Sequence, residues 1–200
     1  MILNDNEISA LSFADDRPIV YPFRGYETSN RGKISRGLTS FGYDLSLDSQ
    51  FRVLDRPTSL LGRLREWIAG PRLIDPKNVD PSLYREVIAS EFLDIAPHSF
   101  ALGMSAEFLH IPDDIVGVCL GKSTYARCGL NVNITPLEPG WKGRLTIELT
   151  NSTPHYLRVY VREGIAQILF FRGSRPCRTY AQKAGIYMNQ TDVTLPRVKS

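Results

Sequence analysis

The sequence predicts a mainly β fold, a compact barrel or jelly roll with a few short helices. From about residue 92 onward, short apolar segments rich in β-branched and aromatic residues follow one another closely. Proline and glycine separate these segments, as expected where one strand ends before the next begins. Closely spaced short strands are typical of antiparallel barrels and jelly rolls. The predicted strands cover residues 100–104, 115–120, 130–134, 145–149, 157–161 and 165–171.

The N-terminal part, residues 1–33, predicts a short helix followed by a loop. Apolar residues at positions 2, 3, 8 and 11 accompany Asn4 and Asp5, a spacing compatible with a capped helix within residues 2–12. From Pro18 to Lys33 the composition changes to proline, glycine, asparagine, serine and arginine, without periodicity. We therefore expect a loop between this helix and the barrel.

A second helix is predicted inside a helical insertion at residues 54–72. It follows the Pro-Thr-Ser sequence at 57–59, and Gly70 and Pro71 end it. Its apolar face could cover a core edge or a contact between subunits, or bind a ligand, and the sequence assigns it no chemistry. The apolar residues at helical spacing are Leu60, Leu61, Leu64, Trp67 and Ile68.

The C-terminal segment, residues 174–200, has no strand pattern. It contains polar and aromatic residues suited to contacting a bound molecule, so it could be a lid that becomes ordered over a ligand. The alternative is a frayed C-terminus. The residues concerned are Tyr180, Lys183, Gly185, Tyr187, Asn189 and Gln190.

Length and composition indicate one domain over residues 1–200. Hydrophobic residues make up 42% and charged residues 22%, and the net charge of +3 is too small to indicate a nucleic-acid coat. The cysteines, Cys119, Cys128 and Cys177, are odd in number and form no C-x-x-C pair, which argues against a disulfide framework. Because no signal-like or membrane-length apolar segment is found, we expect a soluble cytoplasmic protein that binds neither nucleic acid nor membrane.

Residues 143–150 predict a strand with a carboxylate on its polar face. A period of two places the apolar residues 145, 147 and 149 on one face and Glu148 on the other. If that second face lines a cleft, desolvation could raise the pKa of Glu148 and allow it to act as a general base. The alternative is a solvated strand glutamate.

Residues 121–127 (GKSTYAR) directly follow a predicted strand and predict a site for polyphosphate. Backbone N–H groups at a helix start, hydroxyl groups and cationic side chains are the groups that neutralise phosphate oxygens. The spacing is not that of a Walker A loop, and a capped surface helix is the alternative. The candidate ligands of phosphate are Lys122, Ser123, Thr124 and Arg127.

Zinc-dependent deamination lacks its ligands in this sequence. His98, His110 and His155 are scattered, and neither H-x-E nor C-x-x-C is present. Any deamination would therefore have to proceed without zinc at the reacting carbon.

The sequence closely resembles the dCTP deaminases of the trimeric dUTPase-like superfamily at residues 120–130 (LGKSTYARCGL) and 132–141 (VNITPLEPGW). The resemblance covers most of the chain except the N-terminal loop and residues 54–72. Its other matching segments are residues 34–44, 75–78, 163–167 and 194–196.

This resemblance implies a distorted jelly roll assembled as a homotrimer, with active sites between subunits and a C-terminal segment that closes over bound nucleotide. The implied reaction is the hydrolysis of dCTP to dUTP and ammonia, in the supply of pyrimidine deoxynucleotides. Mg²⁺ would be bound through the triphosphate, without ligands from protein side chains, and dTTP is a possible inhibitor.

The resemblance also implies roles for individual residues. Glu148 falls on the family's general acid/base, Ser123 would help hold the attacking water, and Arg127 would add positive charge beside the tetrahedral centre. The backbone at residues 134–136 would recognise cytosine, and Glu138 would bind the sugar 3′-hydroxyl. The full implied substrate-binding set is Lys122, Ser123, Thr124, Arg127, Ile134, Thr135, Pro136, Glu138, Gln167, Tyr180, Lys183 and Gln190.

Three positions depart from the family's pattern. Ile186 stands where the family has a lysine before the tyrosine matching Tyr187, and Asp192 replaces a glycine. Lys183 could supply the missing phosphate contact if the tail is shifted. The alternatives are a substrate of another phosphorylation state or one with a modified base. Ser46 stands where many relatives have an arginine.

Two other functions remain open at this point. One is a bifunctional enzyme, or a dUTPase, that hydrolyses the triphosphate to dUMP and pyrophosphate. The other is a nucleotide-sensing module that retained the barrel but lost efficient chemistry.

Overall fold

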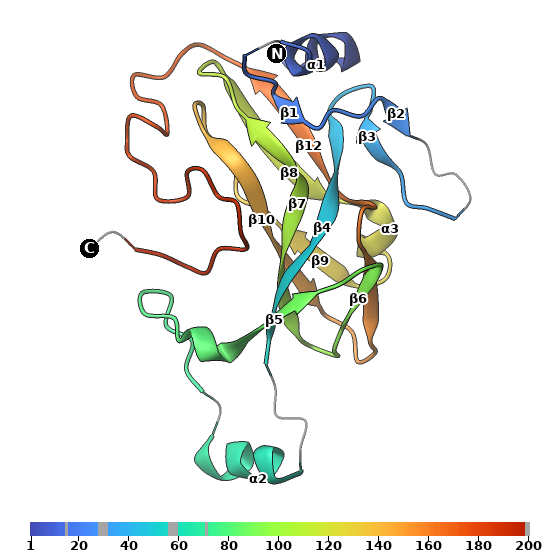
Figure 1. Cartoon of the computed structure of the whole chain (residues 1–200), viewed down its shortest axis with the longest axis vertical. Coiled ribbons are helices and arrows are strands. Elements are labelled where there is room, and N and C mark those ends of the chain that lie inside the picture. The colour runs from blue at the N-terminus through green and yellow to red at the C-terminus, as the bar shows by residue number, and fades with distance from the viewer. Residues whose placement is uncertain (15, 28–31, 56–59, 71, 199–200) are drawn as a thin grey trace.

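The computed structural model describes residues 1–14, 16–27, 32–55, 60–70 and 72–198, and for residues 63, 65 and 66 it describes only the backbone. The described chain is mainly β (Figure 1). Within these residues, ten strands form one curled antiparallel sheet, and two more form a small ribbon. The predicted mainly β class is confirmed.

The sheet has a central path of six strands, onto which four others pair. Along the path lie β2 (Tyr26–Glu27), β3 (Arg36–Leu38), β4 (Tyr43–Leu54), β7 (Phe100–His110), β10 (Lys142–Asn151) and β9 (Leu130–Asn133). The strands off this path are β1 (Val20–Tyr21) on β7, β5 (Tyr84–Ile88) on β4, β12 (Gly164–Arg172) on β4, and β8 (Ile115–Gly121) on β12. The separate ribbon pairs β6 (Phe92–Ile95) with β11 (Leu157–Tyr160).

All six predicted strands are present, as β7 to β12. The sequence prediction missed the twelve-residue β4, although its apolar residues alternate with polar ones. Two of these polar residues, Ser46 and Asp48, are buried. Most of β4 is enclosed, because it pairs with β12 through its first half and with β5 and β7 through its second.

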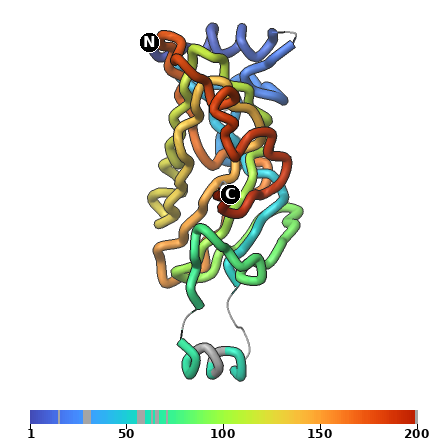
Figure 2. The backbone as a smooth tube through the Cα atoms, turned by 90° about the vertical axis from the view of Figure 1, so that its left-hand side faces the viewer, coloured from blue at the N-terminus to red at the C-terminus, as the bar shows by residue number. Residues whose placement is uncertain are grey.

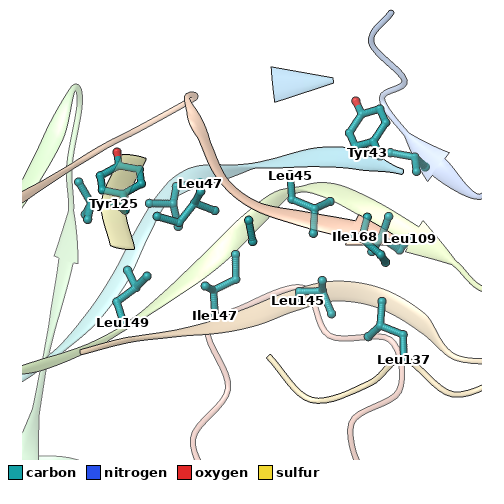
Figure 3. Close-up of a cluster of buried hydrophobic side chains, with 14 of the residues drawn as sticks. Tyr43, Leu45, Leu47, Leu109, Tyr125, Leu137, Leu145, Ile147, Leu149 and Ile168 are labelled. Carbon is teal, nitrogen blue, oxygen red and sulfur yellow. The ribbon is translucent and has the colours of Figure 1, made fainter. Parts of the chain in front are cut away.

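The core lies inside the curl of the sheet. Leu45 and Leu47 of β4 face the side chains of β10 there, as Figure 3 shows. Packing of these apolar side chains from opposite walls removes them from water, which is the main stabilising contribution to such a fold. The β10 residues in this core are Leu145, Ile147 and Leu149.

A buried carboxylate lies next to Ser46 of β4. Glu107 is 1% exposed, and it accepts hydrogen bonds from the Ser46 backbone N–H at 3.0 Å and from Ser46 Oγ at 2.6 Å. Burial raises the pKa of Glu107, and these two hydrogen bonds act in the opposite direction.

The helices are short. α1 (Asp5–Ser12) begins three residues later than the predicted range, after a capping box between Asn4 and Glu7. Residues 2 and 3 are extended instead and pair with the end of β12. The loop predicted from Pro18 contains the two-residue strands β1 and β2, while its residues 28–31 lie outside the described part.

The helix predicted in the insertion is α2 (Leu60–Ala69), which lies beyond the end of the barrel in both views (Figures 1 and 2). Its apolar side chains are exposed, so the helix does not cover a core edge within this chain. The residues predicted to start and stop it, 57–59 and Pro71, lie outside the described residues.

The remaining elements are α3 (Ser123–Ala126) and the 3₁₀ turn η1 (Pro81–Leu83). Among the described residues, no helix combines the length and the hydropathy that a membrane span requires. All three cysteines are free thiols.

Candidate active site

A pocket of about 320 Å³ lies against the outer face of the sheet, under the C-terminal segment. Its walls come from β5, β7, β10, the turn after β9 and the chain beyond Thr179. The volume falls within the usual range of small-molecule sites. The lining residues are Tyr84, Phe100, Leu102, Ile134, Thr135, Pro136, Leu137, Glu138, Trp141, Leu145, Thr146, Glu148, Tyr180, Tyr187, Gln190, Thr194 and Pro196.

Glu148 lines this pocket from β10. The predicted alternation is confirmed, because Ile147 and Leu149 are buried while Glu148 is half-buried on the opposite face. Asn133 of β9 lies directly across from Glu148, with its Nδ2 atom 3.5 Å from Glu148 Oε2. Burial raises the pKa of Glu148, so its carboxylate is a stronger base than a solvated glutamate.

The turn after β9 forms a second wall. Leu137 is buried and exchanges two backbone hydrogen bonds with Gly117 of β8, at 3.0 and 2.8 Å. This anchor fixes the turn to the barrel, so Ile134, Thr135 and Pro136 on one side of it and Glu138 on the other line the same pocket.

The C-terminal segment contacts the barrel at several points between residues 180 and 196. Tyr180 N donates to Pro139 O at 2.8 Å, and Trp141 Nε1 donates to Tyr187 O at 2.9 Å. Gly143 has a φ of 147°, and a Cβ there would lie 2.8 Å from Gln190 N. The close approach of the tail therefore requires glycine at this position.

Thr146 connects the tail to the strand that carries Glu148. Thr194 N donates to Thr146 Oγ1 at 3.2 Å, and the Thr146 hydroxyl donates to Gln190 Oε1 at 3.2 Å. Because side chains alternate along a strand, Thr146 shares the face of Glu148. Two hydrogen bonds thus hold the tail next to the carboxylate.

Lys183 forms an ion pair with Glu138 at the edge of the pocket. Ile186 is half-buried, and Asp192 is exposed. Lys183 is therefore the lysine of the described tail that contacts a carboxylate of the pocket.

A second group of predicted site residues does not line the pocket. Lys122 Nζ contacts Asp44 in an ion pair and donates to Ser35 Oγ at 2.9 Å, and Gln167 Nε2 donates to Thr39 Oγ1 at 3.0 Å. Figure 1 shows α3 and the C-terminal segment on opposite sides of the barrel. The remaining members of this group, Ser123, Thr124 and Arg127, are exposed on or beside α3.

Sequence reasoning assigned no role to several residues of the pocket. Thr146 could have been found, because it shares the polar face of Glu148 by the period of two. Tyr84, Phe100 and Leu102 could not have been found in this way, because long-range strand pairing brings them to the pocket. The strand β5 pairs with β4, and β7 pairs with both β4 and β10.

The donors in the pocket do not suit a zinc ion. The residues that line it include two carboxylates, Glu138 and Glu148, and no histidine or cysteine. Nor does the described part of the chain bring together three or more histidine, cysteine, aspartate or glutamate side chains that could hold a metal ion. The arrangement instead offers one carboxylate of raised pKa beside a partly apolar pocket, which suits proton transfer on a small organic molecule.

A family model described as dCTP deaminase-like matches residues 2–173 of the chain. The dCTP deaminase of Campylobacter curvus (strain 525.92) is 40% identical over 184 residues, which cover 92% of this chain and 91% of that protein. The dCTP deaminase of Acidobacterium capsulatum is 44% identical over 168 residues, which cover 84% and 85% of the two chains.

Among solved structures, the fold is similar to that of the 2′-deoxycytidine 5′-triphosphate deaminase from Agrobacterium tumefaciens. The TM-score is 0.57 at 19% sequence identity, and the match covers 86% of this chain. This chain spans about half (48%) of the length of that protein. At this level of identity the likeness concerns the fold.

Proposed function

The chain belongs to the dCTP deaminase-like family, and on that basis we propose that it hydrolyses dCTP to dUTP and ammonia, with Glu148 as the general acid and base. The observation that carries the role of Glu148 is its position in the pocket, half-buried and with a raised pKa. A carboxylate of raised pKa can both accept and return a proton near neutral pH, which this reaction requires twice.

The proposed reaction begins with ionised Glu148, which takes a proton from water as the water oxygen bonds to cytosine C4. Glu148 then gives this proton to N3, and a tetrahedral centre forms at C4. The second proton of the former water passes through Glu148 to the exocyclic amine. The C4–N bond breaks, ammonia leaves, the C4 carbonyl forms, and dUTP remains.

The walls of the pocket support the proposed orientation of the nucleotide. Residues 134–136 and Glu138 line the same pocket, so the backbone of this turn would bind the cytosine edge and Glu138 would accept from the sugar hydroxyl. The tail residues Tyr180, Lys183 and Gln190 would lie over the substrate. Mg²⁺ carried on the triphosphate would neutralise phosphate charge, and no protein side chain is proposed as its ligand.

We propose further that the working enzyme is a homotrimer with composite sites. The support is the separation of the two groups of site residues within one chain, since Glu148 lines the pocket and Arg127 does not. In a closed symmetric assembly, a neighbouring chain can place its Lys122–Arg127 segment and its Gln167 over this pocket. Ser123 and Arg127 would then act on a substrate held mainly by another subunit.

Zinc independence is part of the same proposal. Its support is the donor set described above, because two carboxylates without imidazole or thiolate are not the ligands of a deaminase zinc. The reducing cytoplasm is the proposed location, which agrees with three free thiols.

The test is an incubation of the purified protein with dCTP and Mg²⁺, followed by separation of the nucleotides and measurement of ammonia. We expect dUTP and ammonia in equal amounts, and a loss of at least about a thousandfold in rate for Glu148→Gln. Glu86→Gln is the matched control, because Glu86 is an exposed strand glutamate paired with Arg52 outside the pocket.

Each other outcome identifies a different function. Appearance of dUMP and pyrophosphate would indicate the bifunctional enzyme, and conversion of dUTP alone would indicate a dUTPase. Binding of dCTP without release of ammonia would contradict the proposal and favour a sensing role. Addition of dTTP to the same assay tests whether this nucleotide inhibits.

A further inference from the structure

The helix α2 presents an apolar face that nothing in the described chain covers. Trp67 and Leu60 are each 83% exposed, and Leu61, Leu64 and Ile68 are at least half exposed. Figures 1 and 2 both show α2 beyond the end of the barrel. Exposed apolar side chains gathered on one surface usually mark a place where the protein contacts another molecule or a lipid surface.

The helix geometry places these residues together. At 3.6 residues per turn, positions 60, 61, 64, 67 and 68 fall within an arc of about 120°. The chain continues this apolar character just after the helix, where Leu73 is 84% exposed and Ile74 is 43% exposed.

Basic positions border this arc on both sides. The sequence has arginine at 63 and 65, which the helix period places just outside opposite edges of the apolar arc, and Glu66 falls on the far side. Arg72 follows the helix and is exposed. An apolar face with tryptophan and leucine between two basic edges is the pattern of helices that lie in the surface of a lipid bilayer.

We propose that α2 is an interfacial anchor that binds this protein to lipid surfaces with anionic headgroups. The apolar face would insert among the upper acyl chains, Trp67 would lie at the headgroup level, and the positive charge along the edges of the helix would attract the anionic headgroups. This revises the expectation from the sequence that the protein binds no membrane. It is independent of the proposed deaminase activity, because α2 contributes no residue to the pocket.

Charge argues for lipid over a second copy of the helix. If two copies of α2 packed through their apolar faces, the positions that flank the contact on both sides would carry arginine, and like charges there destabilise helix pairing. The acidic position lies on the far side and could not compensate. A surface of anionic headgroups instead complements both edges at once.

The first measurement is co-sedimentation of the full chain with vesicles. We expect binding to vesicles of phosphatidylcholine with phosphatidylglycerol, weak binding to phosphatidylcholine alone, and loss of binding as salt is added. The double variant Leu64→Glu/Trp67→Glu should bind at least about tenfold more weakly. Ile88→Glu is the matched control, because Ile88 is 82% exposed on β5, and it should bind like the parent protein.

Tryptophan fluorescence gives a second readout. The chain has two tryptophans, and Trp141 is buried while Trp67 is exposed, so a shift of emission on adding vesicles reports on α2. We expect a blue shift with anionic vesicles that is absent in Trp67→Phe. The double variant Arg63→Gln/Arg65→Gln should lower the anionic-vesicle binding constant about fivefold for each arginine.

Three results would overturn the proposal. The first is no pelleting and no emission shift with anionic vesicles, and the second is an equal loss of binding in the Ile88→Glu control. The third is dissociation of the oligomer by Leu64→Glu/Trp67→Glu, measured by analytical ultracentrifugation, together with no binding of the parent protein to vesicles. The helix α2 would then be a contact between copies of the chain. Deamination of soluble dCTP by these variants, measured in parallel, shows whether a failure concerns the anchor or the enzyme.

Discussion

Glu148 and Glu107 show how one residue type takes two roles through its surroundings. Both carboxyls have pKa values raised by burial. Glu107 is enclosed and accepts two hydrogen bonds from Ser46, so it is inaccessible to a substrate. Glu148 faces a pocket, and Asn133 Nδ2 lies 3.5 Å from its carboxylate. Access, more than the pKa shift, distinguishes the candidate base from the structural carboxylate.

The raised pKa of Glu148 predicts the acid limb of the pH profile. Because the ionised carboxylate is needed to take the proton from water, activity should fall as pH drops through the raised pKa. We expect kcat/KM for dCTP to decline with a midpoint above about 4.3, the ordinary glutamate value. Steady-state rates from pH 4 to pH 9 would show this, with stability followed in parallel. An acid limb at or below the ordinary value would contradict the desolvated environment of Glu148.

Ser46→Ala tests the buried carboxylate. The substitution removes the 2.6 Å hydrogen bond to Glu107 and should lower the free energy of unfolding by about 1–3 kcal/mol at pH 7.5. The effect should shrink as pH falls through the raised pKa of Glu107 in the folded protein, because Ser46 Oγ then meets a neutral carboxyl and the charge-assisted part of the hydrogen bond is lost. Urea unfolding at pH 7.5 and pH 5 measures it. Ser49→Ala, at a partly buried site on the same strand, is the control and should cost less.

At the scale of elements, β10 both builds the core and carries the site. Its apolar face packs inside the sheet, while its polar face holds Glu148 in the pocket and Thr146 against the tail. The position of Glu148 is therefore fixed by burial on the opposite face of the same strand. The tail, which has no regular secondary structure of its own, is ordered by hydrogen bonds to the strand and to Trp141.

Thr146→Val should weaken closure of the tail without unfolding the barrel. Valine keeps the shape but cannot accept from Thr194 N or donate to Gln190 Oε1. We expect KM for dCTP to rise about three- to tenfold, and cleavage of the tail by protease to become faster. Thr150→Val is the control, since Thr150 is exposed on the same strand and lies outside the pocket lining. Equal effects of both variants would remove the special role of Thr146.

At the scale of the whole molecule, the site residues fall into two groups on one chain. Burial and strand order explain this, because α3 follows β8 on one side of the barrel and the tail closes over β10 on the other. A homotrimer with sites between subunits would bring the two groups of site residues together.

Mixed oligomers test this arrangement. Glu148→Gln and Arg127→Ala should each be inactive alone, but co-expression of the two should restore up to about a quarter of the activity, because one site in four would combine two intact halves. Mixing Glu148→Gln with Glu138→Gln should restore none, since both residues line the pocket of one chain. Absence of recovery in the first mixture, with mixed assembly verified by differential tags, would count against composite sites.

Local sequence patterns are sufficient to predict the strands from β7 to β12, the helices α1 and α2, and the face that Glu148 takes on β10. These features depend on periodicity and on local stop signals, which are properties of neighbouring residues. The motifs at residues 120–130 and 132–141 were enough to indicate the family that the comparisons confirm.

The tertiary structure alone decided which walls enclose the pocket and which site residues share it. The strand β4 alternates apolar and polar residues, but only the folded chain buries its polar residues Ser46 and Asp48 and gives them Glu107 and Arg144 as partners. Tyr84 and Phe100 reach the pocket through pairing between distant strands, and the tail is ordered by contacts with Trp141 and Thr146. Long-range pairing leaves no local periodicity, so only the folded chain reveals it.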